Sequence, residues 1–169
     1  MQPKMFAAAT LALLALAGQA LADDEQYRCY TTSDPRCSGD FCGNTFYNPT
    51  VSMNWQQTLQ NADPRAMARL AGVYYMELPN PQMQMINRAY RDYEANGVWG
   101  YQDQTCSSTG CSQNQGAGQW AAYEQRDGSI FLMVHFSDLA RTNACFSQTV
   151  QLSPRGFTDS AGGNWQRVR

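Results

Sequence analysis

The chain has 169 residues, a length typical of one domain. Its formal net charge is −2 and charged residues make up 15% of it, which argues against a nucleic-acid-binding protein, whose footprint is basic. It contains one lysine, Lys4, and one histidine, His135, and this excludes a zinc site built from several histidines. We therefore expect no nucleic-acid partner.

The first 22 residues have the features of a bacterial Sec-type signal peptide. Lys4 provides the positive n-region, residues 6–17 are apolar, and Ala20-Leu21-Ala22 is a small-x-small cleavage site. Cleavage after Ala22 removes the lysine and leaves no later stretch apolar enough to cross a bilayer. The sequence predicts a secreted or periplasmic protein without a transmembrane segment in the mature chain.

Six cysteines follow the predicted cleavage site, an even number that indicates three disulfides in an oxidising compartment. Six cysteines allow 15 pairings. Proximity along the chain favours Cys37–Cys42 and Cys106–Cys111, each with four intervening residues, and this leaves Cys29–Cys145. The two C-x4-C pairs also have the spacing of zinc ligands, but export favours disulfides over metal thiolates. We expect neither a metal site nor a cofactor.

Residues 23–50 form a Cys-rich segment with a turn signal every few residues, such as Asp34-Pro35 and Asn48-Pro49. We expect an irregular segment held by disulfides, followed by one domain over residues 51–169. That domain opens with two helical pieces, the first over about residues 51–60. The second begins at Asp63-Pro64, an N-cap residue followed by proline at the first helical position, and Gly72 is suited to end it.

From residue 73 onward the hydrophobic pattern becomes that of short strands separated by turn signals such as Asn96-Gly97 and Asp127-Gly128. The polar stretch 106–118 is expected to be a long loop pinned by Cys106–Cys111. The predicted strands cover residues 73–78, 83–94, 98–105, 119–125, 129–137, 144–152, 156–158 and 164–169. Eight strands joined by local turns predict a mainly β fold, an antiparallel eight-stranded meander barrel, with a two-sheet β-sandwich as the alternative.

The strand at 130–136 is apolar on both sides, which predicts that both of its faces are covered. We expect one face to point into the barrel and the other to lie under the helical segment. One side of the strand carries Ile130, Leu132, Val134 and Phe136, and the opposite side carries Phe131, Met133 and His135. In another strand, Trp99 and Tyr101 share a face with Asp103.

The order of a helix, the segment Gly72-Val73-Tyr74-Tyr75 and a strand meander resembles the lipocalins and the wider calycin superfamily over about residues 60–169. That family opens its first strand with Gly-x-Trp, and Tyr74 stands where the family has tryptophan. The family packs a late arginine across this ring, so the resemblance implies that Arg167 or Arg169 lies on Tyr74. Ser137-Asp138-Leu139 resembles the family's Thr-Asp-Tyr turn. The resemblance implies a lipocalin-like barrel with an interior ligand.

Aromatic and methionine side chains are the most suggestive functional feature of the chain. Four tryptophans and nine tyrosines are present, and Met76, Met83, Met85 and Met133 are available to line an adaptable apolar pocket. We expect a small apolar or amphipathic ligand. The predicted pocket wall consists of Tyr75, Trp99, Trp120, Phe131, Met133 and His135.

The main alternative is an exported module that binds an envelope protein or inhibits a hydrolase. It would act through the Cys106–Cys111 loop and the loop at residues 29–49, because disulfide-pinned loops need little ordering on binding. An enzyme is the third hypothesis. His135 is the sole possible imidazole base, with Asp138 three residues further on, but no G-x-S-x-G motif provides a nucleophile. We predict no catalytic residues.

Overall fold

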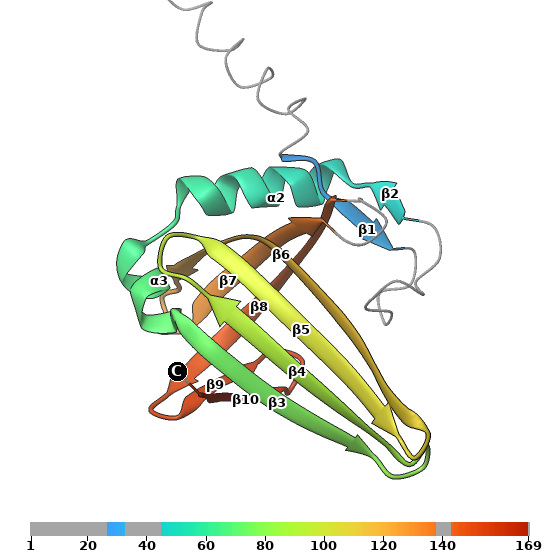
Figure 1. The fold of residues 1–169 in the computed structure, drawn as a ribbon. Coiled ribbons are helices and arrows are strands. Elements are labelled where there is room, and N and C mark those ends of the chain that lie inside the picture. The colour runs from blue at the N-terminus through green and yellow to red at the C-terminus, as the bar shows by residue number, and fades with distance from the viewer. Residues whose placement is uncertain (1–26, 33–44, 138–142, 169) are drawn as a thin grey trace, which may run out of the picture.

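The computed structural model describes residues 27–32, 45–137 and 143–168, which form a closed antiparallel β-barrel with two helices on one side (Figure 1). Helix α2 spans Pro49–Gln60 and helix α3 spans Pro64–Leu70. Two short strands come first, β1 Tyr30–Thr32 and β2 Thr45–Tyr47. The barrel strands are β3 Gly72–Asn80, β4 Met85–Tyr93, β5 Val98–Ser107, β6 Gly110–Glu124, β7 Ile130–Ser137, β8 Asn143–Ser153, β9 Gly156–Asp159 and β10 Asn164–Arg167.

Each strand from β3 to β10 pairs with the next one along the chain, and β10 pairs with β3 to close the barrel. The predicted eight-stranded meander barrel is therefore confirmed, and the sandwich alternative is excluded because the strands form one continuous ring. Strand β1 adds to the ring in parallel with β8, at Tyr30 opposite Ala144, and β2 pairs with β1.

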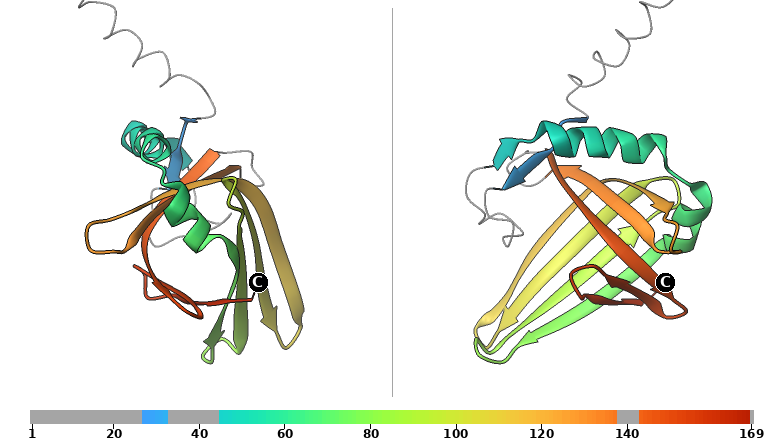
Figure 2. Two further views of the ribbon diagram at one scale, coloured as in Figure 1. Left: turned by 90° about the vertical axis from the view of Figure 1, so that its left-hand side faces the viewer. Right: turned by 180° about the vertical axis from the view of Figure 1, so that it is seen from behind.

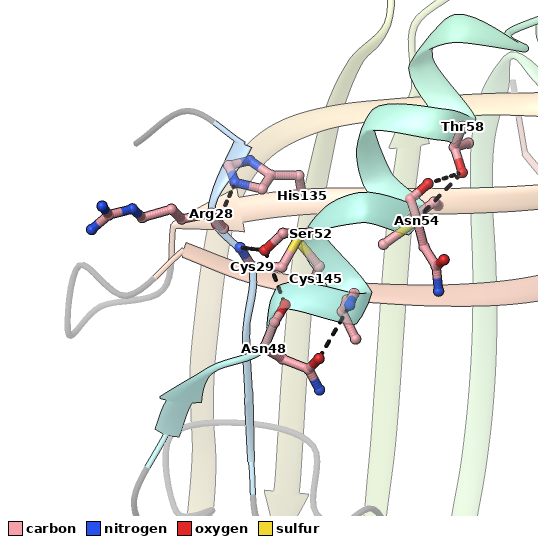
Figure 3. Close-up of a disulfide and its surroundings, with 10 residues drawn as sticks. Arg28, Cys29, Asn48, Ser52, Asn54, Thr58, His135 and Cys145 are labelled. Atoms are coloured by element: carbon pink, nitrogen blue, oxygen red, sulfur yellow. Dashed lines mark hydrogen bonds between the residues drawn. A yellow bond between two sulfur atoms is a disulfide. The ribbon is translucent and has the colours of Figure 1, made fainter. Parts of the chain in front are cut away.

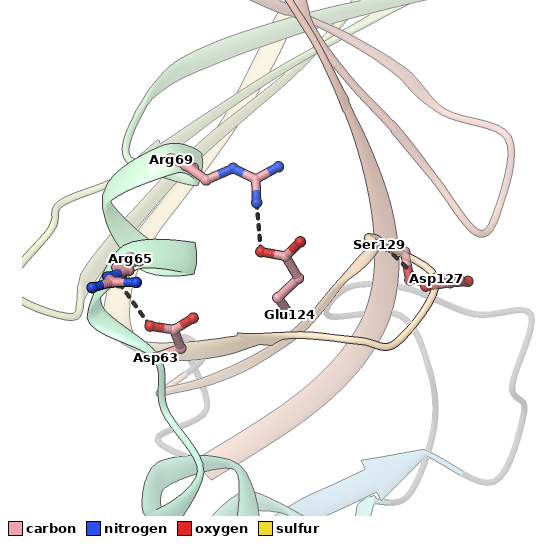
Figure 4. Close-up of polar contacts among 6 residues, drawn as sticks. All are labelled: Asp63, Arg65, Arg69, Glu124, Asp127 and Ser129. Atoms are coloured by element: carbon pink, nitrogen blue, oxygen red, sulfur yellow. Dashed lines mark hydrogen bonds and ion pairs between the residues drawn. The ribbon is translucent and has the colours of Figure 1, made fainter.

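Both helices begin with an Asx residue followed by proline. Asn48 accepts a hydrogen bond from the Val51 N–H at 3.1 Å, and Asp63 accepts one from the Arg65 N–H at 2.9 Å (Figure 4). The first helix starts before its predicted residue because Asn48-Pro49, expected to be a turn, is a helix start of the same kind as Asp63-Pro64. The Asp63 N–H also donates to the Ala122 carbonyl of β6 at 2.9 Å, which fixes α3 against the barrel.

Aromatic rings fill the half of the barrel interior next to α3. Tyr74, Tyr93, Trp120 and Phe157 are at most 1% exposed, and the rings pack edge to face, with centroids 4.7 Å apart for Tyr74 and Phe157. Their polar tips are satisfied by backbone: the Tyr74 hydroxyl donates to the Leu70 carbonyl at 2.8 Å, and the Trp120 indole N–H donates to the carbonyl that follows β4 at 2.9 Å. Leu70 covers this end of the barrel.

Helix α2 lies across the outer faces of β6, β7 and β8 (Figure 2). Its Trp55 is fully buried and packs with Ala121 and Met133, and the Thr58 hydroxyl lies 3.7 Å from the Met133 sulfur. The two-sided cover predicted for the strand at 130–136 is confirmed. The structure assigns the two faces: Ile130, Leu132, Val134 and Phe136 pack in the barrel core, and Phe131, Met133 and His135 face outward, where Met133 and its neighbours pack with α2.

A disulfide and three hydrogen bonds join the N-terminal segment to α2 and the barrel (Figure 3). Cys29 is bonded to Cys145 of β8, as predicted. The Cys29 N–H donates to the Ser52 hydroxyl at 2.8 Å, the Ser52 hydroxyl donates to the Asn48 carbonyl at 3.0 Å, and the Asn48 N–H donates to the Cys29 carbonyl at 2.9 Å. The predicted Cys37–Cys42 disulfide lies outside the described residues.

The polar stretch 106–118 is not a loop, contrary to expectation. Residues 110–118 form the first part of β6 and pair with β5 residue by residue. Inward-facing Gly116 and Gly118 stand there instead of apolar side chains, so the usual alternation is missing. A Cβ at Gly116 would lie 2.5 Å from the Tyr101 ring, so this glycine makes room for it. The predicted Cys106–Cys111 disulfide is present and joins two paired strands.

Strands β3 to β6 extend beyond the rest of the barrel (Figure 1). Strand β10 pairs with β3 at Tyr74 and Tyr75, and β7 pairs with β6 from Gly118 onward. The four strands beyond these points form a sheet that we call the tongue, residues 75–90 and 102–115. Its inner face continues the wall of the barrel, and its outer face points away from it.

Candidate functional site

The six residues predicted to form one pocket wall lie in three places. Trp99 and Trp120 point into the barrel and are buried. Phe131, Met133 and His135 lie on the outer face of β7, and Tyr75 lies on the outer face of β3. Because successive residues of a strand point to opposite faces, a set that mixes both faces cannot share one wall. The expected single wall is therefore corrected.

His135 has a packing role in this arrangement. Its ring stacks on Trp55 with centroids 5.5 Å apart, and its Nε2 donates to the Arg28 carbonyl at 3.1 Å (Figure 3). Burial lowers the pKa of His135 from its ordinary value of 6.5, which favours the neutral imidazole. Asp138, considered as its partner, lies outside the described residues.

The barrel interior away from α3 contains a second group of rings, which we call the ring floor: Trp99, Tyr101, Phe136 and Phe146. The Trp99 centroid lies 5.1 Å from Tyr101, 5.3 Å from Phe136 and 5.8 Å from Phe146. Trp99 is buried, but the other three rings remain partly accessible although they point inward. An inward-facing ring that solvent reaches is available to a ligand, unlike the rings packed beneath α3.

One ion pair lies beside the ring floor. Arg91 of β4 faces Asp103 of β5 through two hydrogen bonds, Nη1 to Oδ1 at 2.6 Å and Nη2 to Oδ2 at 3.2 Å. The side chain of Arg91 is 18% exposed and that of Asp103 is 43% exposed. The guanidinium carbon lies 6.0 Å from the Trp99 centroid, 5.6 Å from Tyr101 and 5.2 Å from Trp165, within cation–π range of all three rings.

Within the part of the chain that the structure describes, the contacts of the Arg91 guanidinium leave some of its N–H donors unused. Its bonds to Asp103 and one bond from Nη1 to the Tyr90 carbonyl at 2.8 Å use three of the five N–H groups of an arginine side chain. The remaining two can donate to an acceptor on a bound molecule. The site therefore combines an apolar aromatic surface with a small polar group, the usual composition of a small-molecule site.

Part of this group could be located from the sequence, although the sequence did not mark it as a site. The strand pattern shows that Trp99 and Tyr101 share a face with Asp103, but it leaves open whether the side of strand 130–136 that carries Phe136 points inward. Arg91 was missed. Strand pairing brings these residues together: Arg91 lies opposite Tyr101, and Phe136 lies opposite Gly118. Neither register can be predicted from residue types alone.

A groove also lies at β9 and β10. It is lined by Ser153, Pro154, Arg155, Asn164, Trp165, Gln166, Arg167 and Val168. None of the six predicted pocket residues contributes to it. Across residues 27–32, 45–137 and 143–168, no helix is long and apolar enough to cross a membrane.

Comparison with protein-family models, with curated proteins and with solved structures finds no match. The class of the protein is therefore defined by its own topology. It is a small, closed, antiparallel eight-stranded β-barrel with disulfides and an α2–α3 layer.

Proposed function

We propose that this is an exported, disulfide-stabilised β-barrel that binds a small amphipathic molecule on the ring floor. The observation that carries the proposal is the partial exposure of Tyr101, Phe136 and Phe146 inside the barrel, beside the Arg91–Asp103 pair. Elsewhere in the interior, rings of the same kind are buried. The resemblance to the lipocalins supports the same proposal.

The two parts of the site favour different parts of the ligand. The accessible rings favour a flat or chain-like apolar body, because contact with it removes apolar surface from water. The free N–H groups of Arg91 favour an acceptor such as a carboxylate, sulfonate or carbonyl oxygen. The Asp103 carboxylate, which is partly exposed, can accept from a hydroxyl or amide of the same molecule.

Export is the second part of the proposal. The signal-peptide features of residues 1–22 support it, and so do the two disulfides at Cys29–Cys145 and Cys106–Cys111, because disulfides persist in oxidising compartments. The expected location is the periplasm or the medium.

The test uses 1-anilinonaphthalene-8-sulfonate, an amphipathic probe whose fluorescence rises in apolar surroundings. We expect saturable binding to the exported protein and a loss of affinity of about tenfold in Tyr101→Ala and in Phe136→Ala, since each removes an aromatic contact. Tyr90→Ala is the matched control, because Tyr90 is a tyrosine on the outer face of the tongue. Melting curves establish that the parent protein and the three variants are folded. If all four then bind the probe with equal affinity, the proposal is overturned.

A second candidate function is protein binding through the tip of the tongue. Leu78 is 51% exposed and Met83 is 64% exposed at the β3–β4 hairpin, next to the hairpin that Cys106–Cys111 joins. Cross-linking of the exported protein in its native envelope tests this candidate. Loss of a cross-linked partner in Leu78→Asp, with no change in Val98→Asp at the opposite end of the tongue strands, would support it; identical cross-links in both variants would exclude it.

A further inference from the structure

The outer face of the tongue carries an ordered array of polar and aromatic side chains. The strand registers place them in two rows that run across all four strands. The first row is Tyr75, Tyr90, Gln102 and Gln115, and the second row is Glu77, Arg88, Gln104 and Gln113. This face points away from the ring floor, so the inference below does not rest on the proposed function.

Side-chain contacts hold the part of this array on β3 and β4 in place. The Tyr75 hydroxyl donates to Glu77 at 2.6 Å, and the Arg88 Nε–H donates to the same carboxylate at 3.1 Å. These bonds lower the pKa of Glu77, the bond from Tyr75 first, so the network stays intact at neutral pH. The rings of Tyr75 and Tyr90 lie 4.9 Å apart with a tilt of 44°, and Tyr90 is 37% exposed. A preorganised surface loses little side-chain entropy on binding.

The charge of the array restricts its partner. Glu77 and Arg88 neutralise each other, and the other six side chains are neutral. A nucleic acid or an acidic polysaccharide would find no net positive charge there, and a basic partner would find no net negative charge. The glutamines offer neutral amide donors and acceptors, and the exposed tyrosine ring offers a flat apolar face.

We infer that the outer face of the tongue binds a neutral polysaccharide chain. Sugar hydroxyls match the donors and acceptors of the glutamine amides, and the C–H face of a sugar ring matches the ring of Tyr90. Three inter-strand spacings make the array about 14 Å wide, which gives room for a short run of sugar units side by side. The chain lies across the strands, along the two rows.

Affinity electrophoresis of the folded exported protein tests this inference. The gels contain dextran, laminarin, xyloglucan or arabinoxylan as neutral probes, and alginate as an acidic control. We expect retardation in at least one neutral gel, no retardation by alginate, and a loss of affinity of about tenfold in Tyr90→Ala. Tyr123→Ala is the matched control, because Tyr123 lies on the outer face of the barrel outside the tongue, against Phe131.

Gln102→Ala provides an independent second variant in the same row and is expected to weaken retardation as well. The inference is overturned if no neutral polysaccharide retards the protein, if alginate retards it equally, or if Tyr90→Ala and Tyr123→Ala behave alike. Tyr101→Ala, on the ring floor, is expected to leave retardation unchanged. Polysaccharide retardation reports on the tongue and probe binding reports on the ring floor. A failure of one test is therefore distinguishable from a failure of the other.

Discussion

Arg167 lies across the ring of Tyr74, with its guanidinium carbon 5.6 Å from the ring centroid. The same guanidinium donates hydrogen bonds to the carbonyls of Ala71 and Arg69, at the end of α3. One side chain therefore joins the last strand of the barrel to the first strand and to the helix that covers its end, and it satisfies carbonyl groups that the helix leaves without partners. The contact is the one that the lipocalin resemblance implied for Arg167; Arg169 lies outside the described residues.

Replacing Arg167 by alanine is expected to lower the free energy of unfolding by about 1–2 kcal/mol, because the cation–π contact and the charged hydrogen bonds are lost at an exposed position. Urea denaturation measures the change. Arg155→Ala, an exposed arginine in the turn before β9, is the control and is expected to stay within about 0.5 kcal/mol of the parent. Equal midpoints for both variants would contradict a joining role for Arg167.

The two described disulfides are expected to differ in their effect on stability. Cys29–Cys145 closes a loop with a sequence separation of 116, and Cys106–Cys111 closes one of 5. The chain-entropy model gives a loss of about 5 kcal/mol for the double alanine variant of the first pair and about 2 kcal/mol for that of the second. Denaturation under non-reducing conditions ranks them. A larger loss from the short-range pair would show that Cys29–Cys145 does not restrain the unfolded chain as the structure implies.

Stability is expected to fall as the pH falls below the ordinary pKa of histidine. The pKa of His135 is lowered from 6.5 by burial, so the unfolded chain binds a proton at a pH at which the native chain does not. The contribution of neutral His135 is complete above pH 6.5 and is lost as the pH falls toward its native pKa. We compare urea midpoints at about pH 7.5 and about pH 5.5 in the parent and in His135→Gln. A variant that keeps the full pH dependence of the parent would show that other groups cause it.

Alanine substitutions at Gly118 of β6 and at Gly100 of β5 test how closely the strands approach one another beside the ring floor. A Cβ at Gly118 would overlap the His135 carbonyl and Phe136, so Gly118→Ala is expected to cost about 1–3 kcal/mol. A Cβ at Gly100 would meet its nearest atom at an ordinary 3.8 Å, so Gly100→Ala is expected to change stability by less than about 0.5 kcal/mol. Thermal melts compare the two. Equal losses would mean that β6 and β7 do not approach as closely as the register requires.

Local chemistry explains which parts of the fold could be predicted. Asp63-Pro64 begins a helix because its cap and its fixed φ act within a few residues, and Asn96-Gly97 turns the chain between β4 and β5 for the same reason. The barrel follows from a series of such local turns. The apolar residues on both sides of strand 130–136 also predicted that both of its faces are covered. Which face is the inner one could not be predicted, and the expected pocket wall used Phe131, Met133 and His135, which face outward.

Longer-range relations explain what could not be predicted. Residues 110–118 lack apolar alternation because their inward positions carry glycines and small polar residues, and two of them, Gly116 and Gly118, make room for Tyr101 and Phe136 on the neighbouring strands. The predicted pocket wall failed to form because residue type alone does not assign a face; Tyr75 is next to the buried Tyr74 yet points the other way. Arg91 joins the ring floor through strand register, which the tertiary structure sets.

NMR chemical-shift mapping with 1-anilinonaphthalene-8-sulfonate is the direct test of ligand binding on the ring floor. The four tryptophans of the chain provide separate indole signals. We expect the indole signal of Trp99 and the amides of Tyr101 and Phe136 to shift on titration, while the indole signal of Trp55, buried under α2, does not. Shifts confined to Trp55 or to the outer face of the tongue, or an absence of shifts at Trp99, would contradict it.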